Sequence, residues 1–361
     1  MHEALRPYVT AGVTVLGASM IAITPIAATS AVGLHAMPDV ALTAGADLGD
    51  INFTQAWTDA FDTAKENATA LQTAAKDASS ALSDALKTVD FKDLDFKQLG
   101  DALTFLGGDQ KNFIDHLVPQ TLGNNHALMF DVITDPAGTL TGGTPVLPDD
   151  ILPIVNFLAS PLSGQIFGAL GPSISPLVAL FNSFEAISAD LSTADGHVAD
   201  ATAALQEMVN IPANMLNGFL NGSTLDLDAL VPELAKLDLP LPAGLSIDHL
   251  SLGFGGLLSP GDVIGTLGDE TTPSAIGSVG GSIFNGLGVG LAGVPVLGTL
   301  DLTPHGVGPL AASTMIENFL SQWLSGDLPA LTAPDTTSGS SEAVDGLSAL
   351  LGGFDLSSIG L

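Results

Sequence analysis

An apolar seam that runs from Ile51 to Val89 without a glycine or a proline limits most strongly what this chain can fold into. Its apolar side chains recur at intervals of three and four residues, close to the 3.5-residue period of helices that pack along one stripe. This pattern predicts one long helix, or two helices with a break between them. The members of the seam are Phe53, Trp57, Phe61, Ala64, Ala68, Leu71, Ala75, Ala78, Leu82, Ala85 and Val89.

A second seam lies in FEAISADLSTADGHVADATAALQEMVN, residues 184–210. Gly196 costs this helix about 1 kcal/mol of propensity, and Pro212 is expected to end it. Because alanine side chains are small, we expect two Ala-rich long helices to pack closely as an antiparallel pair. His197 stands alone on this segment and is expected to be solvated or packed rather than to bind a ligand. The apolar positions are Ile187, Leu191, Ala194, Val198, Ala201, Leu205 and Met208.

The segment between the two seams, Ile151 to Phe184, carries no charged residue and is interrupted by prolines. Proline removes one helical hydrogen bond and clashes with the preceding turn, so we expect several short apolar helices with corners. In water these pieces would bury against each other. In a lipid they could form a hairpin or a re-entrant element. The sequence favours the buried core. The prolines are Pro153, Pro161, Pro172 and Pro176.

Residues 222–260 alternate apolar and polar side chains in TLDLDAL, LDLPLP and HLSLGFG, which predicts a small antiparallel β element. The fold class is therefore mainly α, and α+β overall. Asp226 and Asp228 share one strand face and could bind calcium, although such a pair is more typical of a solvated face. The spacing lacks the acidic ladder, the turn glycine and the distal glutamate of an EF-hand loop.

The stretch GLGVGLAGVPVLGTL, residues 286–300, contains the G-x-G-x-x-G pattern of dinucleotide-binding loops. That interpretation needs a strand before the glycines and a helix after them, and Pro295 opposes the helix. Eight glycines between residues 271 and 300 also argue against a straight membrane helix. Two alternatives stay open: close helix packing through G-x-x-x-G, and a strand that another backbone approaches closely.

Charge and composition exclude several classes of function. The chain has 39 acidic and 8 basic residues, a net charge of −31, and Arg6 as its one arginine. It therefore has no basic cluster for nucleic acid or for anionic lipid. It has no cysteine, so disulfides and thiolate sites are excluded. His116 and His126 lie ten residues apart, and we do not expect them to share a ligand. We expect no enzyme activity, no cofactor and no metal site.

The chain divides into five regions by composition. Residues 1–31 have a short polar head, an apolar core and small residues, the anatomy of a secretory signal peptide, with an uncleaved anchor as the alternative. Residues 32–50 form a linker, 51–221 a helical domain, and 222–328 a Gly/Pro-rich apolar region that holds the small sheet. STMIENFLSQWL, residues 313–324, predicts an amphipathic helix within that region. Residues 329–361 are a flexible tail rich in Ser, Thr and Gly.

Several phrases resemble a known family: the opening MHEALRPYVTAGVTVLGASMIAITPI, and later IPANMLNGFLNG, GLLSPGDVIGTL and HGVGPLAA. They are similar to mycobacterial cell-envelope proteins labelled outer-membrane porins of the Gordonia porin A type. Phrases like IPANMLNGFLNG also occur in the C-terminal regions of PE and PPE proteins, although the paired Pro-Glu opening of PE proteins is missing. The resemblance implies export to the envelope, a channel for small hydrophilic solutes, and cation preference.

The residues themselves support export better than they support a pore. A lipid-facing barrel needs repeated stretches of about ten alternating residues with aromatic girdles, and only a few short alternating pieces are present. The alternative hypothesis is a secreted or surface-exposed helical protein, not an enzyme, that binds other envelope or host components. Both hypotheses give it membrane or cell-envelope lipids and proteins as partners, allow a homo-oligomer, and exclude nucleic acid.

Overall fold

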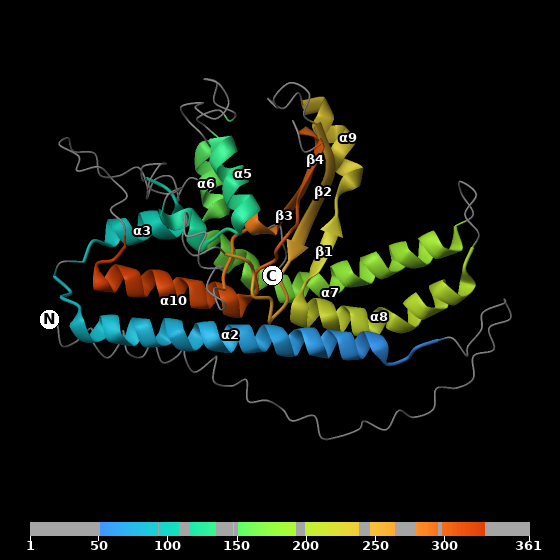
Figure 1. Cartoon of the computed structure of the whole chain (residues 1–361), viewed down its shortest axis with the longest axis horizontal. Coiled ribbons are helices and arrows are strands. Elements are labelled where there is room, and N and C mark those ends of the chain that lie inside the picture. Colours follow the sequence, from blue (N-terminus) through green and yellow to red (C-terminus); the bar gives the residue numbers. More distant parts are fainter. Residues whose placement is uncertain are drawn as a thin grey trace, which may run out of the picture.

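A computed structural model describes residues 51–92, 94–107, 116–134, 147, 151–192, 199–237, 246–263, 279–294 and 298–328. The predicted signal segment, linker and tail, and His197, lie outside these residues. Figure 1 shows a mainly helical molecule with one small sheet. The helices are α2 (Gln55–Thr88), α3 (Phe96–Thr104), α5 (Asn124–Thr134), α6 (Leu152–Ala159), α7 (Pro161–Leu191), α8 (Ala201–Asn221), α9 (Val231–Leu234) and α10 (Pro309–Ser325). The strands are β1 (Ser223–Asp226), β2 (Ser246–Phe254), β3 (Leu287–Val294) and β4 (Gly298–Leu302).

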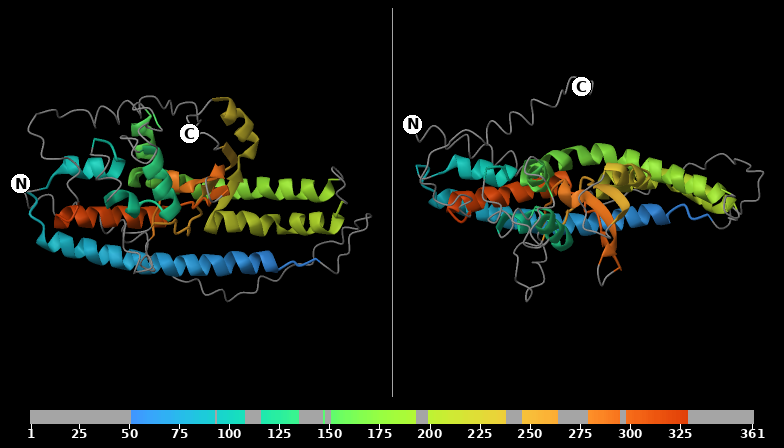
Figure 2. Two further views of the ribbon diagram at one scale, coloured as in Figure 1. Left: turned by 45° about the horizontal axis from the view of Figure 1, so that its top comes forward. Right: turned by 90° about the horizontal axis from the view of Figure 1, so that it is seen from above.

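The predicted α+β class is confirmed. Two long helices do pack antiparallel, but they are α7 and α8 rather than the two Ala-rich seams (Figures 1 and 2). The second seam is divided between the end of α7 and the start of α8. Gly218 of α8 lies against Ser175 of α7, while Asn214 donates to the Ser183 hydroxyl at 3.0 Å. Residue numbers therefore rise along one helix where they fall along the other, as in an antiparallel pair.

The long Ala-rich helix α2 packs along α8, and the two chains run in the same direction. Hydrogen bonds show this, because the start of α2 lies beside the start of α8 and the middle of α2 lies beside the end of α8. The backbone N–H of Asn52 donates to Gln206 at 2.7 Å, and Asn67 donates to Asn221 at 3.1 Å. α2 is therefore parallel to α8 and antiparallel to α7.

The expectation of several short helices in residues 151–184 holds only at its start. α6 ends at Ala159 and Pro161 begins α7, as expected, but the later prolines do not divide the chain further. Pro172 and Pro176 lie inside the 31-residue helix α7, and Pro212 lies inside α8 rather than ending it. Each proline costs about 3 kcal/mol of helix propensity. Tertiary contacts outweigh that cost: the hydroxyl of Ser175, between the two prolines, donates to the carbonyls of Phe254 and Gly255, each at 3.1 Å.

The sheet extends beyond the region in which it was predicted. β1 and β2 lie within residues 222–260, as expected, but β3 and β4 come from the glycine-rich stretch and the residues after it. All neighbours are antiparallel in the order β1-β2-β3-β4. Of the two open alternatives for GLGVGLAG, the structure shows the strand.

Gly288 and Gly290 sit within β3, opposite Ser251 and His249 of β2. A Cβ on Gly288 would overlap the Ser251 hydroxyl, and one on Gly290 would lie 2.8 Å from the Cβ of His249. The glycines therefore serve close strand packing rather than the cradling of a phosphate.

The core lies where α10 meets the short helices. Phe319 of α10 is fully buried, as are Phe105 and Phe130, and the predicted amphipathic helix is confirmed with Met315 and Trp323 also buried. A second cluster joins α2 to α10 through residues such as Leu71 and Ala311. Sequence from both sides of residue 222 therefore contributes to the same cores.

The seam on α2 is confirmed in its C-terminal part and wrong at its start. Leu71 and Leu82 are buried, whereas Phe53, Trp57 and Phe61 are exposed. α10 covers the later turns of α2. Near the beginning of α2 the small residue Ala60 faces α8 instead, and its carbonyl accepts a hydrogen bond from Asn221 at the end of α8.

Candidate functional site

Six large apolar side chains of α7 are exposed on one side of the helix, although Phe167 and Val178 of the same helix are buried. At 100° per residue they fall within an arc of about 80°, and they span about 38 Å along the helix. Leu177 at the centre of this row is 61% exposed. We call this set the outer row; it consists of Ile166, Leu170, Leu177, Phe181, Phe184 and Leu191.

The opposite side of α7 carries its smallest residues and faces backbone. A Cβ on Gly164 would overlap the carbonyl oxygen of Gly281, and a Cβ on Gly171 would overlap that of Gly255. A Cβ on Gly168 would lie 3.0 Å from the carbonyl oxygen of Gly308. A helix of a soluble protein normally turns its large apolar residues inward. On α7 most of the large apolar residues face solvent instead, so the outer row is an apolar surface that packing within the described residues does not explain.

α7 is also the one helix, within the described part of the chain, that is long and apolar enough to cross a membrane. Only 39% of its most apolar window is buried, and no charged residue occurs before Glu185. These properties concern length and composition. They agree with the outer row in marking α7 as the helix most suited to an apolar environment.

A separate polar cluster forms where β1 and β2 meet. The structure adds His249 to the predicted pair Asp226 and Asp228, and one ligand atom of each lies within 4.8 Å of the others. His249 Nδ1 is 2.8 Å from Asp228 Oδ1, which also accepts the backbone N–H of Leu250. Both carboxylates are exposed, and Asp226 accepts the backbone N–H of Asp228 at 2.7 Å. Within this cluster, His249 and Asp228 form an ion pair that links the end of β1 to β2.

This ion pair predicts a pH dependence. The hydrogen bond with Asp228 raises the pKa of His249, and the Leu250 N–H followed by His249 lowers the pKa of Asp228. The contribution of His249 to stability is present in full below its unfolded pKa of about 6.5 and is lost as pH rises through its raised folded pKa. The contribution of Asp228 is lost as pH falls below about 3.8 toward its lowered folded pKa.

An NMR titration of the His249 ring is expected to give a lower pKa in Asp228→Asn than in the natural chain. Asp248→Asn is the matched control, because Asp248 precedes His249 but makes no hydrogen bond to it among the described residues. An unchanged His249 pKa in Asp228→Asn would contradict the ion pair.

The histidines His116 and His126 differ in setting. His116 is exposed. His126 is buried, and its Nε2–H donates to the carbonyl of Leu287 at 2.7 Å. Burial lowers the pKa of His126. Its ring centroid lies 6.1 Å from that of His305, whose Nε2 is 3.7 Å from Asp262. His126 thus acts as a neutral packing residue between α5 and β3.

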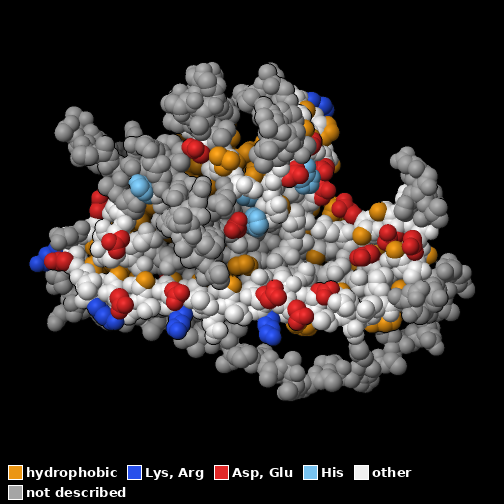
Figure 3. Space-filling model, in the orientation of Figure 1, with side chains coloured by type: hydrophobic (Ala, Val, Ile, Leu, Met, Phe, Trp, Pro, Cys, Tyr) orange, Lys and Arg blue, Asp and Glu red, His pale blue; other side chains and the backbone are white. Residues whose placement is uncertain are grey.

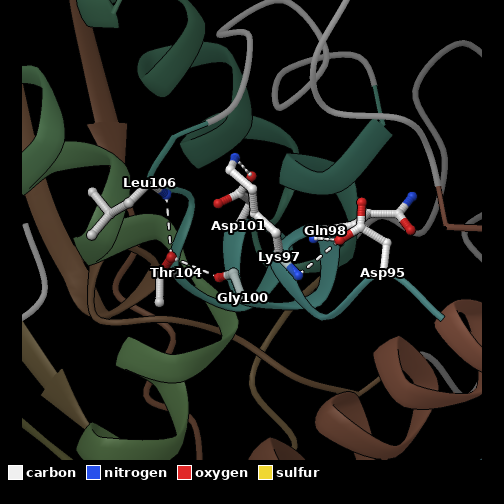
Figure 4. Close-up of polar contacts among 7 residues, drawn as sticks. All are labelled: Asp95, Lys97, Gln98, Gly100, Asp101, Thr104 and Leu106. Atoms are coloured by element: carbon white, nitrogen blue, oxygen red, sulfur yellow. Dashed lines mark hydrogen bonds and ion pairs between the residues drawn. The ribbon is translucent and has the colours of Figure 1, made fainter. Parts of the chain in front are cut away.

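Two buried carboxylates complete the polar interior. Asp101 of α3 binds Lys97 at 2.8 Å, and its second oxygen has no hydrogen-bond partner in the described residues (Figure 4). Glu317 of α10 accepts the Ser79 hydroxyl of α2 at 3.0 Å. Burial raises the pKa of both groups. Each carboxylate has a side-chain partner on an adjacent turn or helix, which accounts for its position.

Comparison with known proteins gives no identity. No protein-family description, curated protein or solved structure matches the chain.

Proposed function

We propose that the chain is an exported, non-enzymatic protein of the cell envelope that attaches to lipid through the outer row of α7. The observation that carries this proposal is the orientation of α7, with three glycines toward the fold and the six side chains of the outer row toward solvent. Its export rests on the signal-like first 31 residues.

The energy of attachment comes from apolar burial. Fully burying one leucine or phenylalanine side chain is worth about 1.5–3 kcal/mol, and the outer row offers several such side chains at once. Charge does not assist: the net charge is −31, and the visible surface carries scattered acidic side chains, with blue lysines mainly along α2 (Figure 3). We therefore expect preference for neutral lipid over anionic lipid.

Flotation with vesicles tests the proposal. The purified chain is expected to float with neutral phosphatidylcholine vesicles and to float less as anionic lipid is added, because like charges repel. The double variant Phe181→Ser/Phe184→Ser is expected to lose most of this binding, since it removes two adjacent members of the outer row.

Leu128→Ser is the matched control, because Leu128 is a comparably exposed apolar residue on α5. It is expected to float like the natural chain. Equal flotation of the double variant and the natural chain would sink the proposal, and so would stronger binding to anionic than to neutral vesicles.

The channel role implied by the resemblance is a further step beyond attachment. Current through planar bilayers in the presence of the purified chain would support it, and flat traces at every protein concentration would count against it. If the chain stays soluble without detergent and does not bind vesicles, the result would instead favour the alternative hypothesis of a surface-exposed protein that binds other envelope components.

A further inference from the structure

A polar groove lies between the beginnings of α2 and α8. Its volume is about 490 Å³. From α8 come four amide side chains at helical spacing, which share one face of that helix. The floor is formed by the small residues Ala56 and Ala60. The complete lining is Asn52, Gln55, Ala56, Asp59, Ala60, Thr63, Gln206, Asn210, Asn214 and Asn217.

Hydrogen bonds join the two helices at both ends of this groove. At one end Gln206 exchanges two bonds with the backbone of Asn52, at 2.7 and 2.8 Å. At the other end Asn221 donates to the carbonyl of Ala60 at 2.9 Å and accepts from Asn67. The helices are thus held at a fixed separation, and the groove between the ends is preformed.

The amides in the middle keep hydrogen-bonding capacity to spare. Asn210 accepts from Gln206 at 2.8 Å, and Asn217 accepts from Asn221 at 2.7 Å, but neither side-chain NH2 donates to another described residue. The side-chain NH2 of Asn214 donates to the Ser183 hydroxyl. The side-chain oxygen of Asn214 accepts no hydrogen bond from any described residue. Donors and acceptors therefore alternate along one wall.

The lining selects for an uncharged ligand. It contains no lysine or arginine to bind an anion, and its single carboxylate, Asp59, already accepts from Gln55 at 2.7 Å. An apolar ligand would leave the wall amides unpaired, which costs about 1–3 kcal/mol for each buried group. A ligand with many hydroxyls and an apolar C–H face matches both the amide wall and the alanine floor.

We propose that this groove binds a neutral saccharide. Hydroxyls of the sugar accept from Asn210 and Asn217 and donate to Asn214, while a C–H face of the ring lies on Ala56 and Ala60. The proposal is independent of lipid attachment, because the groove shares no residue with the outer row.

Saturation-transfer NMR tests the proposal, with maltotriose, cellotriose and mannotriose as probes and triglycine as the peptide comparison. At least one trisaccharide is expected to receive saturation from the natural chain, and triglycine is not. Absence of transfer to all three trisaccharides would overturn the proposal, as would transfer to triglycine alone.

Asn210→Leu separates recognition from folding. Leucine has the higher helix propensity, so the melting temperature is expected to hold or rise, while affinity for the bound trisaccharide falls about tenfold with the lost hydrogen bond. Gln72→Leu is the matched control on α2 outside the groove, and it is expected to bind normally. Full affinity in Asn210→Leu would refute the assigned groove.

Discussion

Gly171→Ala is expected to lower the free energy of unfolding by about 3 kcal/mol or more, the upper range for overpacking a tight core. The three atoms nearest to the added Cβ all belong to the backbone of Gly255, so no flexible side chain can move aside. The helix and the segment after β2 would have to separate. Urea denaturation followed by circular dichroism measures the loss.

Gly100→Ala is the matched control for this prediction. Gly100 is also inside a helix, α3, but a Cβ there would meet nothing within 4 Å. Alanine is the better helix former, so the variant is expected to gain up to about 1 kcal/mol. Similar effects of the two substitutions would show that α7 does not pack backbone to backbone.

Phe319→Ala is expected to cost about 3–5 kcal/mol, because it removes a fully buried aromatic ring and leaves a cavity. Phe319 lies in the cluster that joins α10 to the short helices, so few neighbours can collapse into the space. The change is measured by thermal and urea unfolding of the purified variant.

Phe184→Ala provides the comparison, because this phenylalanine is 55% exposed on the outer row. Its unfolding free energy is expected to change by less than about 0.5 kcal/mol, as for most surface substitutions. A large loss at Phe184 would mean that α7 turns this face inward, and the proposal of lipid attachment would then lose its basis.

Periodicity predicted the elements in which buried and exposed side chains alternate in a regular pattern. α10 and the later turns of α2 follow a helical seam, and β2 follows a period of two, so each could be placed from sequence. β3 could not be chosen over a helix, because glycine has no side chain whose alternation marks a face. The continuation of α7 through Pro172 could not be predicted, because local propensity does not include tertiary contacts such as those of Ser175 with Phe254 and Gly255.

The candidate surfaces were harder to predict than the fold. The residues Leu170, Leu177, Phe184 and Leu191 repeat every seven positions, and this signal was present in the sequence. Apolarity alone does not say which side of a helix faces inward, and on α7 the inward side was decided by three glycines. His249 joined Asp228 only through strand pairing, which brings residues 21 positions apart into contact.

The glycine side of α7 also determines how a force on this helix would spread. Gly164, Gly168 and Gly171 rest against three different backbone segments, at Gly281, Gly308 and Gly255. Rotation of α7 about its own axis would drive larger neighbouring side chains into those carbonyls. A bilayer that pulls on the outer row would therefore move α7, the sheet and the start of α10 together as a rigid lever.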